Sequence, residues 1–392
     1  MGPLRGLRVV EMAGLGPGPF AAMMLADMGA EVVRVDRPPS AHDAHGDGAG
    51  RRDRVDPRRY VMHRGRRSIA VDLKHPDAAE VLLRMVEQAD ALIEGFRPGV
   101  MERLGLGPEA CLARNPRLAY GRMTGWGQHG PLAGAAGHDI DYIALAGALR
   151  NFVRPPDRPV APLNLVGDFG GGGMFLAFGL LCAIHEASRS GCGQVVDAAM
   201  VDGTAVLTTM FHGLRAQGLW YDEPGTNWAD SGAPYYEVFE TADGEYVAVG
   251  ALERPFYDEL VRRVGLDAGE LPPRGDETNW PGLKARFEAL FRSRTRAEWC
   301  DLLEGTDACF APVLSFAEAP RHPHNVARST FVEHDGVLQP APAPRFDRTP
   351  AGLSHPPPRP GEHTAAVLAD WGFSGDEIAR LASSGAVRRV DS

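Results

Sequence analysis

The chain is poor in cysteine and almost devoid of lysine. It has 392 residues, and its five cysteines show no Cys-x-x-Cys spacing. An odd number of scattered cysteines is typical of free thiols in a reducing compartment, so we expect a cytoplasmic protein. The only lysines are Lys74 and Lys284, so arginine supplies almost all of the positive charge.

Long apolar runs and a positive net charge are also missing. No stretch approaches the roughly 20 apolar residues that cross a bilayer, and residues 170–184 fit a core helix better. The N-terminus leads directly into an apolar strand, which does not fit a secretory signal peptide. The net charge of −10 argues against a general nucleic-acid binder. We therefore expect neither a membrane nor a nucleic acid as partner.

The commonest hydrolase and metal motifs are absent. The sequence contains no Gly-x-Ser-x-Gly and no His-Glu-x-x-His, which removes the usual α/β-hydrolase and zinc-protease interpretations. His42 with His45, and His322 with His324, could be drawn as metal ligands. Neither pair lies on a strand or helix that would hold ligand geometry, so we predict surface loops and no metal site.

What the sequence does contain is an alternation of strand-like and helix-like segments. Such an alternation predicts an α/β fold, in which helices wrap a parallel sheet. The expected strands are 7–13, 31–36, 91–96, 118–124 and 194–199. The expected helices are 20–28, 78–88, 174–188 and 202–217. Residues 38–56 have no periodicity and are expected to form a loop.

A change in composition after residue 217 predicts a smaller α+β domain. Residues 235–240 and 245–250 look like a hairpin joined by a short Gly-containing turn, and three helical segments follow at 255–264, 280–293 and 296–305. Residues 311–313 lead out, 336–361 form a proline-rich return, and 364–381 are helical. The expected domains are 1–200 plus 325–392 (large), 230–310 (small), with a linker helix at 201–229 and a return linker at 311–324.

Two features suggest a nucleotide-containing ligand. Residues 14–19, Gly-Leu-Gly-Pro-Gly-Pro, follow a strand and precede a helix, but Pro19 replaces the third glycine of a dinucleotide fingerprint. A tight turn open to some other nucleotide is the better interpretation. Arginines are clustered between Arg51 and Arg67; this cluster is either a solvated loop or a site for a polyanion such as a nucleotide phosphate.

The most informative pair of residues is His138 and Asp168. His138 lies in Gly-His-Asp-Ile-Asp-Tyr at 137–142, and Asp168 lies in Asn-Leu-Val-Gly-Asp-Phe at 164–169, which four glycines follow. Taken singly, each fits a structural role better: a hydrogen-bonded histidine, and a cap for a helix that starts near Gly170. Taken with the rest of the chain, they fit two bases that add and remove a proton on opposite faces of one carbon.

The sequence resembles the class III coenzyme A transferase superfamily over nearly its whole length. Within that superfamily, residues 137–142 and 166–169 resemble the α-methylacyl-CoA racemase branch, especially its bacterial members. The other segments that carry the resemblance are residues 4–11, 30–38, 66–74, 94–99, 124–127, 202–203 and 361–364.

The resemblance implies a fold and a set of site residues. It implies a Rossmann-like large domain, a small domain between two linkers, and two subunits interlocked as a homodimer. The bases match His138 and Asp168, and a glutamate that orients the histidine matches Glu253. Asn164, Tyr142 and Gly170 would support the substrate site. The insertion near 40–56 departs from the family pattern. Four arginines match positions at or near the coenzyme A phosphates and adenine: Arg37, Arg64, Arg67 and Arg97.

The implied activity is epimerisation of 2-methylacyl-CoA thioesters in fatty acid metabolism. Coenzyme A would then be part of the substrate, and no separate cofactor is expected. One base removes the α-hydrogen, an enolate forms, and the other base returns a proton to the opposite face.

The alternative is a class III transferase in which Asp168 is a nucleophile; the presence of His138 with Glu253 favours the racemase. A protein that only binds acyl-CoA is the third possibility.

Overall fold

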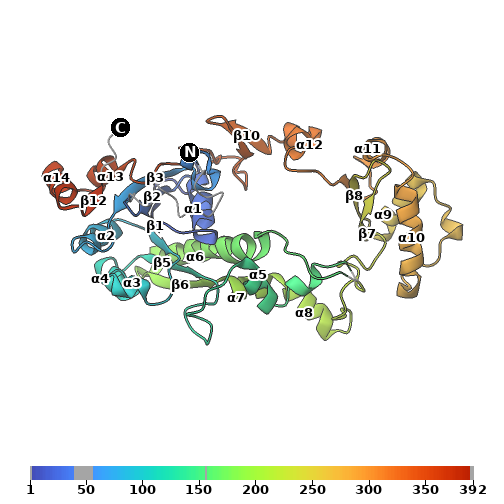
Figure 1. Ribbon diagram of the computed structural model, residues 1–392, viewed down its shortest axis with the longest axis horizontal. Helices are drawn as coiled ribbons and strands as arrows, with labels where there is room; N and C mark the ends of the chain where they lie inside the picture. Colours follow the sequence, from blue (N-terminus) through green and yellow to red (C-terminus); the bar gives the residue numbers. More distant parts are fainter. Residues whose placement is uncertain (1, 39–55, 155–156, 389–392) are drawn as a thin grey trace, which may run out of the picture. The chain divides into compact units, whose positions relative to one another are not determined.

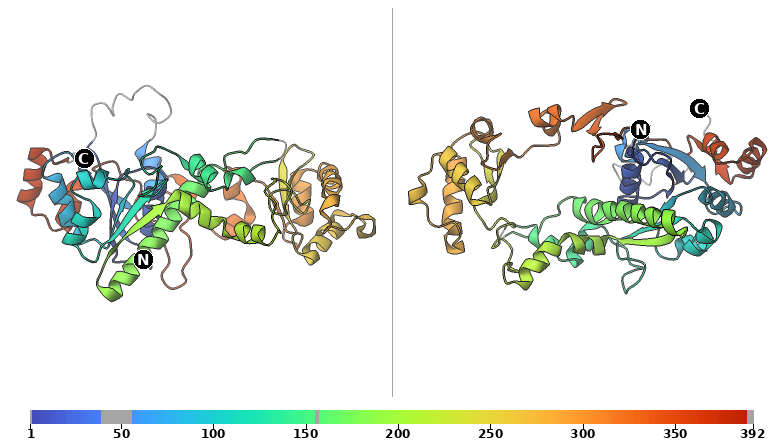
Figure 2. Two further views of the ribbon diagram at one scale, coloured as in Figure 1. Left: turned by 90° about the horizontal axis from the view of Figure 1, so that it is seen from below. Right: turned by 180° about the vertical axis from the view of Figure 1, so that it is seen from behind.

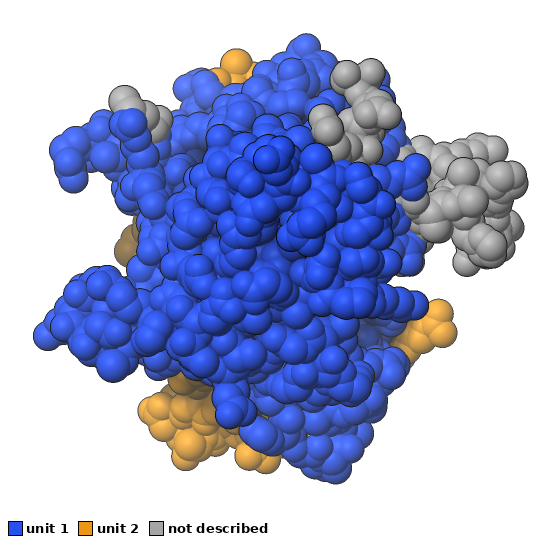
Figure 3. All heavy atoms as spheres, turned by 90° about the vertical axis from the view of Figure 1, so that its left-hand side faces the viewer, with its two compact units in different colours: residues 1–146, 163–207, 327–392 blue, residues 147–162, 208–326 orange. Residues whose placement is uncertain are grey.

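The computed structural model describes residues 2–38, 56–154 and 157–388, and these residues form two compact units (Figure 1). Unit 1 contains residues 1–146, 163–207 and 327–392, and unit 2 contains residues 147–162 and 208–326. Figure 3 colours the two units separately. Nearly all of the expected loop at 38–56, with His42, His45 and the first arginines of the cluster, lies outside the described residues.

Unit 1 is built on a seven-stranded sheet with the order β12-β3-β2-β1-β4-β5-β6. Six strands pair in parallel and β12 pairs with β3 in the antiparallel sense, so the predicted parallel sheet is confirmed. The strands are β1 (Arg8–Met12), β2 (Glu31–Asp36), β3 (Arg66–Val71), β4 (Ala91–Glu94), β5 (Ala119–Thr124), β6 (Gln194–Ala199) and β12 (Val387–Arg388).

Alternate residues of the central strands enter two different cores. Val10 and Val33 pack into one core, and their neighbours Val9 and Val32 pack into the other. Each fully buried valine contributes about 1.5–3 kcal/mol, which fixes the register of both strands. The first core is covered by α2 (Ala78–Val86), α3 (Val100–Arg103), α4 (Pro108–Arg114), α13 (Thr364–Asp370) and α14 (Gly375–Ser384). The second is covered by α1 (Pro17–Asp27), α5 (Asp139–Leu145) and α6 (Phe175–Ser190).

A 26-residue helix, Leu165–Ser190, crosses the second core. It begins as a π-helix, η5 (Leu165–Met174), and continues as α6, the long green helix of Figure 1. By length and composition it could cross a membrane, with a hydropathy of 1.6 over its most apolar window, which differs from our expectation that no such segment exists. Leu176 and Leu180 are nevertheless fully buried in the second core, as expected for a core helix.

The four-glycine run lies inside this helix, where it allows close packing. A Cβ atom at Gly172 would lie 2.9 Å from Pro17 of α1 and 2.8 Å from Met200 of α7 (Met200–Leu207), and one at Gly171 would lie 2.7 Å from the backbone of Thr204. These glycines therefore let η5 fit between α1 and α7.

Unit 2 contains the predicted hairpin and helices. β7 (Tyr236–Glu240) and β8 (Tyr246–Gly250) form an antiparallel pair, and β9 (Phe310–Pro312) adds a third strand. The helices are α8 (Thr209–Ala216), α9 (Arg254–Val264), α10 (Trp280–Phe291) and α11 (Arg296–Leu303). Figure 2 shows the hairpin and these helices from two further sides.

The domain boundaries differ from the expected ones in two places. The helix expected at 202–217 breaks at Thr208, so α7 belongs to unit 1 and α8 to unit 2. Residues 147–162 belong to unit 2, where Arg154 binds the buried carboxylate of Glu237 at 2.6 Å. The return segment is also more structured than predicted, with α12 (Pro323–Ala327) followed by an antiparallel hairpin of β10 (Phe331–His334) and β11 (Val337–Pro340).

Candidate active site

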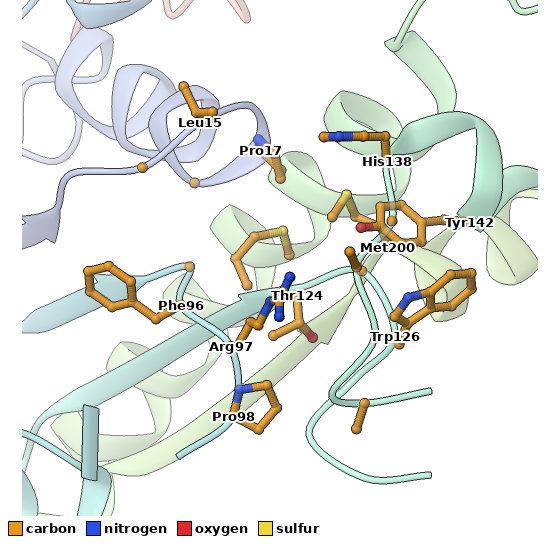
Figure 4. Close-up of a pocket in the computed structure, with 18 of the residues that line it drawn as sticks. Leu15, Pro17, Phe96, Arg97, Pro98, Thr124, Trp126, His138, Tyr142 and Met200 are labelled. Atoms are coloured by element: carbon orange, nitrogen blue, oxygen red, sulfur yellow. The ribbon is translucent and has the colours of Figure 1, made fainter. Parts of the chain in front are cut away.

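A cavity of about 340 Å³ opens at the carboxyl ends of β1, β4 and β5 in unit 1. This is the edge of a parallel α/β sheet where ligands usually bind. Figure 4 shows His138 and Tyr142 on one side, Leu15 and Pro17 across from them, and Arg97 with its guanidinium toward the centre. The cavity therefore combines an imidazole, an arginine and apolar walls.

The Gly-Pro turn closes one side of this cavity without forming a dinucleotide site. Gly16 has a φ of 65°, which favours glycine, and α1 starts at Pro17. Since Pro17 and Pro19 have no N–H, the first helical turn lacks most of the donors that hold a pyrophosphate. Asp36, at the end of β2, accepts a hydrogen bond from Ser68 at 2.7 Å and pairs with Arg34 at 3.0 Å, so its carboxylate is already engaged.

His138 immediately precedes the first turn of α5. Its backbone N–H donates to Asp141 at 2.9 Å, and its carbonyl accepts from the N–H of Asp141 at 2.8 Å. These reciprocal bonds fix the main chain and leave the imidazole exposed beside the cavity. The sequence thus places an accessible imidazole on a rigid main-chain support.

Asp168 lies in the first turn of η5 and is half-buried, close to Gly16, which stands between the cavity-lining residues Leu15 and Pro17. Its Oδ2 atom accepts a hydrogen bond from Asn164 Nδ2 at 2.9 Å, and its N–H donates to Asp139 Oδ1 at 2.7 Å. A Cβ atom on Gly16 would lie 2.8 Å from Oδ2, so only glycine leaves the carboxylate room. The helix begins at Leu165, so the interpretation of Asp168 as the cap of a helix starting near Gly170 was wrong.

The surroundings of Asp168 favour its protonated form. Burial raises the pKa of this carboxyl above its ordinary value, and the negative charge of Asp139 raises it further. The hydrogen bond from Asn164 and the charge of His138 act in the opposite direction. His138 is therefore close enough to Asp168 to interact with it electrostatically.

Tyr142 lies beneath these two groups. Its ring packs edge-on against Trp126 with centroids 4.7 Å apart, and a Cβ atom on Gly125 would lie only 2.4 Å from its hydroxyl oxygen. Burial, followed by the charge of Asp168, raises the pKa of Tyr142 to about 12. Tyr142 is therefore a hydrogen-bond donor at neutral pH rather than a base. His138, Asp168, Asn164 and Tyr142, all expected at one site, do lie together in unit 1.

Glu253 lies in unit 2, where it directly precedes α9. Its side chain is exposed. The two units are described separately, so the expected contact between Glu253 and His138 stays a prediction.

The four expected coenzyme A arginines divide between the two edges of the sheet. Arg37 follows the end of β2 and Arg97 follows the end of β4, at the edge that carries the cavity. Arg64 and Arg67 lie at the opposite, amino edge, where β3 begins. Arg67 pairs there with Glu31 and Asp370, each at 2.5 Å.

The structure therefore corrects the grouping of these arginines. Arg64 is buried, and its guanidinium donates to Asp27 at 3.1 and 2.6 Å and to Gln339 at 2.9 Å. A guanidinium enclosed in this way is a structural group, because its hydrogen bonds leave few N–H donors for a phosphate. Only Arg37 and Arg97 lie where a ligand of the cavity would reach them.

Sequence reasoning missed Asp139. The residue was read only as part of a motif, although its carboxylate is 6% exposed and binds the main chain of Asp168. The available signal was its position beside His138 at a helix start, where a buried acid is unusual. For metals, the described part of the chain contains no group of three or more histidine, cysteine, aspartate or glutamate side chains that could hold an ion.

Comparison with known proteins identifies the class. A family model described as CoA-transferase family III matches residues 4–364, so the chain belongs to that family. It is 47% identical over 382 residues to alpha-methylacyl-CoA racemase of Mus musculus, which covers 97% of this chain and 96% of that one. The protein of the same name from Homo sapiens is 46% identical with the same coverage. A CAIB/BAIF family protein from Brucella suis has a similar fold, with a TM-score of 0.80 at 25% identity over 94% of this chain and 99% of that one.

Proposed function

We propose that this chain is an α-methylacyl-CoA racemase that epimerises C2 of 2-methylacyl-CoA thioesters. The observation that carries the proposal is the closeness of Asp168 to His138, which lines the cavity, in a chain closely similar to two racemases. The enzyme is an isomerase, and coenzyme A enters as part of its substrate.

The two bases would exchange roles between the two directions of reaction. In one direction neutral His138 takes the C2 proton, the C–H electron pair moves into an enolate, and protonated Asp168 delivers its proton to the opposite face of C2. In the reverse direction Asp168 is the base and the imidazolium is the acid. Each positioned acid or base contributes roughly 10²–10⁴-fold to the rate.

The enolate needs positive potential near its oxygen. The first turn of the 26-residue helix Leu165–Ser190 contains Asp168, and a helix N-terminus favours negative charge. Gly170–Gly173 lie inside η5, where their N–H groups serve the helix itself, so the N-terminal turn as a whole would supply the potential.

A second copy of the chain would complete the site as a homodimer. Several apolar side chains of unit 1 are exposed on the long helix and α7, including Phe178 (68%), Leu165 (55%) and Val206 (54%). Exposed apolar surface of this kind usually marks an interface. In the interlocked dimer that we propose, the partner's small domain would bring a glutamate equivalent to Glu253 to His138, where it would fix the tautomer of the imidazole.

The coenzyme A moiety would bind at the carboxyl edge through Arg37 and Arg97. Arginine forms charge-assisted, often bidentate bonds to phosphates. We further propose a cytoplasmic location and a role in fatty acid metabolism, supported by five free cysteines and by the class of substrate.

Isotope exchange tests the function. A single-enantiomer 2-methylacyl-CoA in deuterated water, without an acceptor acid, should yield both epimers with deuterium at C2, because both bases exchange protons with solvent. A class III transferase would do nothing until a free carboxylic acid was added. A covalent adduct trapped by hydroxylamine, without deuterium at C2, would refute the racemase. A protein that only binds acyl-CoA would give neither result.

A further inference from the structure

We propose that Asp139 is a positioning residue of the reaction, which holds the main chain of Asp168 from the neighbouring helix α5 and sets the electrostatic surroundings of its carboxyl group. The inference rests on the proposed roles of His138 and Asp168. Asp139 itself would touch neither substrate nor the reacting atoms, because its carboxylate lies behind Asp168.

The first part of the inference rests on the contact between α5 and η5. Asp139 Oδ1 accepts the N–H of Asp168 at 2.7 Å. This N–H belongs to the first helical turn, where no carbonyl within the helix is available to it. Asp139 therefore supplies the missing acceptor from another helix. Because the bonded nitrogen is attached to the Cα atom that carries the Asp168 side chain, the bond also restrains the position from which the carboxyl group extends.

Gly167 leaves the space that the carboxylate of Asp139 occupies. A Cβ atom on Gly167 would lie 2.6 Å from Asp139 Oδ1 and 2.9 Å from its Cγ. Any larger residue at 167 would push the carboxylate away from η5. The glycine directly before Asp168 is thus explained by Asp139 rather than by substrate access.

The second part of the inference rests on the other carboxylate oxygen. Asp139 Oδ2 is buried and has no hydrogen-bond partner among the described residues. A carboxylate there would be poorly screened, because water does not reach this oxygen. Its charge would act on the carboxyl of Asp168 and also on the hydroxyl of Tyr142.

The charged groups that act on the Asp168 carboxyl are Asp139 and His138, both from α5 or its start. Tyr142 of the same helix adds a neutral hydroxyl, and Asp141 is bound to the main chain of His138. Gly16, directly before α1, and Thr204 of α7 contact η5 and are uncharged, and Asp202 of α7 is exposed to solvent. Asp139 is thus the one nearby negative group, in the described part of the chain, that disfavours the Asp168 carboxylate.

A two-base racemase needs both distributions of the shared proton between its bases to be populated. With one proton shared between them, the bases exist either as carboxylic acid and imidazole or as carboxylate and imidazolium, and each form reacts with one epimer. An aspartate and a histidine with ordinary pKa values of about 3.9 and 6.5 would favour the charged form roughly 400-fold. Burial and Asp139 both reduce this preference, which makes the neutral form available.

The test measures kcat/KM against pH for two variants. They should move the acid limb, which is the fall in kcat/KM at low pH, in opposite directions. Asp139→Asn keeps an oxygen acceptor for the Asp168 N–H but removes the charge, so the limb should move to lower pH by about one unit. The rate at the optimum should fall roughly tenfold, equally for both epimers because they are nearly equal in free energy. Asn164→Ala removes a hydrogen bond to the Asp168 carboxylate, so the limb should move to higher pH.

Asp139→Ala removes the acceptor as well, and we expect its kcat to fall further than that of Asp139→Asn. If Asp168→Ala is inactive but the acid limb of Asp139→Asn stays in place, the inference is overturned and the proposed function stands. If Asp168→Ala is active, the proposed function itself fails.

A measurement on the unaltered protein covers the case in which the Asp139 variants do not fold. Carbon-13 NMR of protein labelled at the aspartate carboxyls, with Asp168→Asn for assignment, should show that Asp168 loses its proton above the ordinary aspartate pKa of about 3.9. An Asp168 carboxyl that loses its proton at or below that value would contradict the inference.

Discussion

Arg64 binds the carboxylate of Asp27 through two bonds, of 3.1 Å from Nε and 2.6 Å from Nη2, and both side chains are almost fully buried. The pair joins the end of α1 to the start of β3, at the amino edge of the sheet. It lies away from the cavity and holds the two elements together.

We predict that Arg64→Ala destabilises the fold without weakening substrate binding. Removing one partner of a buried pair leaves the other charge uncompensated, which costs about 3–5 kcal/mol. Chemical denaturation should show this loss, while the KM for acyl-CoA of the protein that remains folded should be unchanged. A large rise in KM at unchanged stability would return Arg64 to the coenzyme A site.

Arg97→Ala should show the opposite pattern. Arg97 is exposed and its guanidinium points into the cavity (Figure 4), so its loss removes a phosphate contact but little packing. We expect KM to rise by roughly tenfold or more, since charge-assisted hydrogen bonds contribute about 1.5–3 kcal/mol. The rise should shrink at high salt, and the unfolding midpoint should stay within error of the unaltered protein.

His138→Ala and Asp168→Ala should each abolish racemisation and leave the fold and coenzyme A affinity largely intact. The expected loss is at least ~10²-fold for either base, because neither base can replace the other on its own face of C2. Turnover can be followed by optical rotation and by deuterium at C2. Near-normal turnover in either variant would remove that residue from the mechanism.

Mixed dimers should recover activity from two inactive proteins. Co-expressed His138→Ala and Glu253→Ala subunits would form mixed dimers in which one site has both residues. We expect roughly a quarter of the unaltered activity, because random pairing makes half of the dimers mixed and each has one intact site. If mixed dimers form and remain inactive, His138 and Glu253 act within one chain.

Gly172→Ala should lower both stability and activity. Its new methyl group would lie within 2.8–2.9 Å of Met200 and Pro17, and the strain of overpacking costs about 1–3 kcal/mol. Gly213→Ala in α8 is the matched control, since nothing lies within 4 Å of its Cβ position. That variant should be neutral or gain about 0.5–1 kcal/mol. Equal effects in the two variants would mean that packing around η5 is not tight.

Much of the fold follows from apolar periodicity and turn chemistry. β1 was predicted from a short apolar run, β2 from alternation along its residues, and the hairpin β7–β8 from the turn Ala242-Asp243-Gly244. β3 was not predicted as a strand, because Arg66, Arg67 and Ser68 look polar. In the structure Arg66 is fully buried against Glu11 at 3.0 Å, a partner 55 residues away.

The candidate site was predicted only in part, because its contacts also join residues that are far apart in the sequence. His138, Asp168, Asn164 and Tyr142 were found because they stand in short motifs that resemble a known family. Arg64 and Arg67 were misplaced because closeness to a strand in sequence does not say which edge of the sheet a side chain occupies. Asp139 was missed because its role depends on η5, which starts earlier than periodicity suggested.

The placement of the C-terminal segment has a consequence for how the chain folds during synthesis. Leu368 and Trp371 of this segment are buried in the core of unit 1, and β12 pairs with β3 at the edge of the sheet. Unit 2, residues 147–162 and 208–326, leaves the ribosome before this segment is made. We therefore expect unit 2 to reach its native state first, while part of one core of unit 1 is still exposed to water. Chaperones should then act chiefly on unit 1.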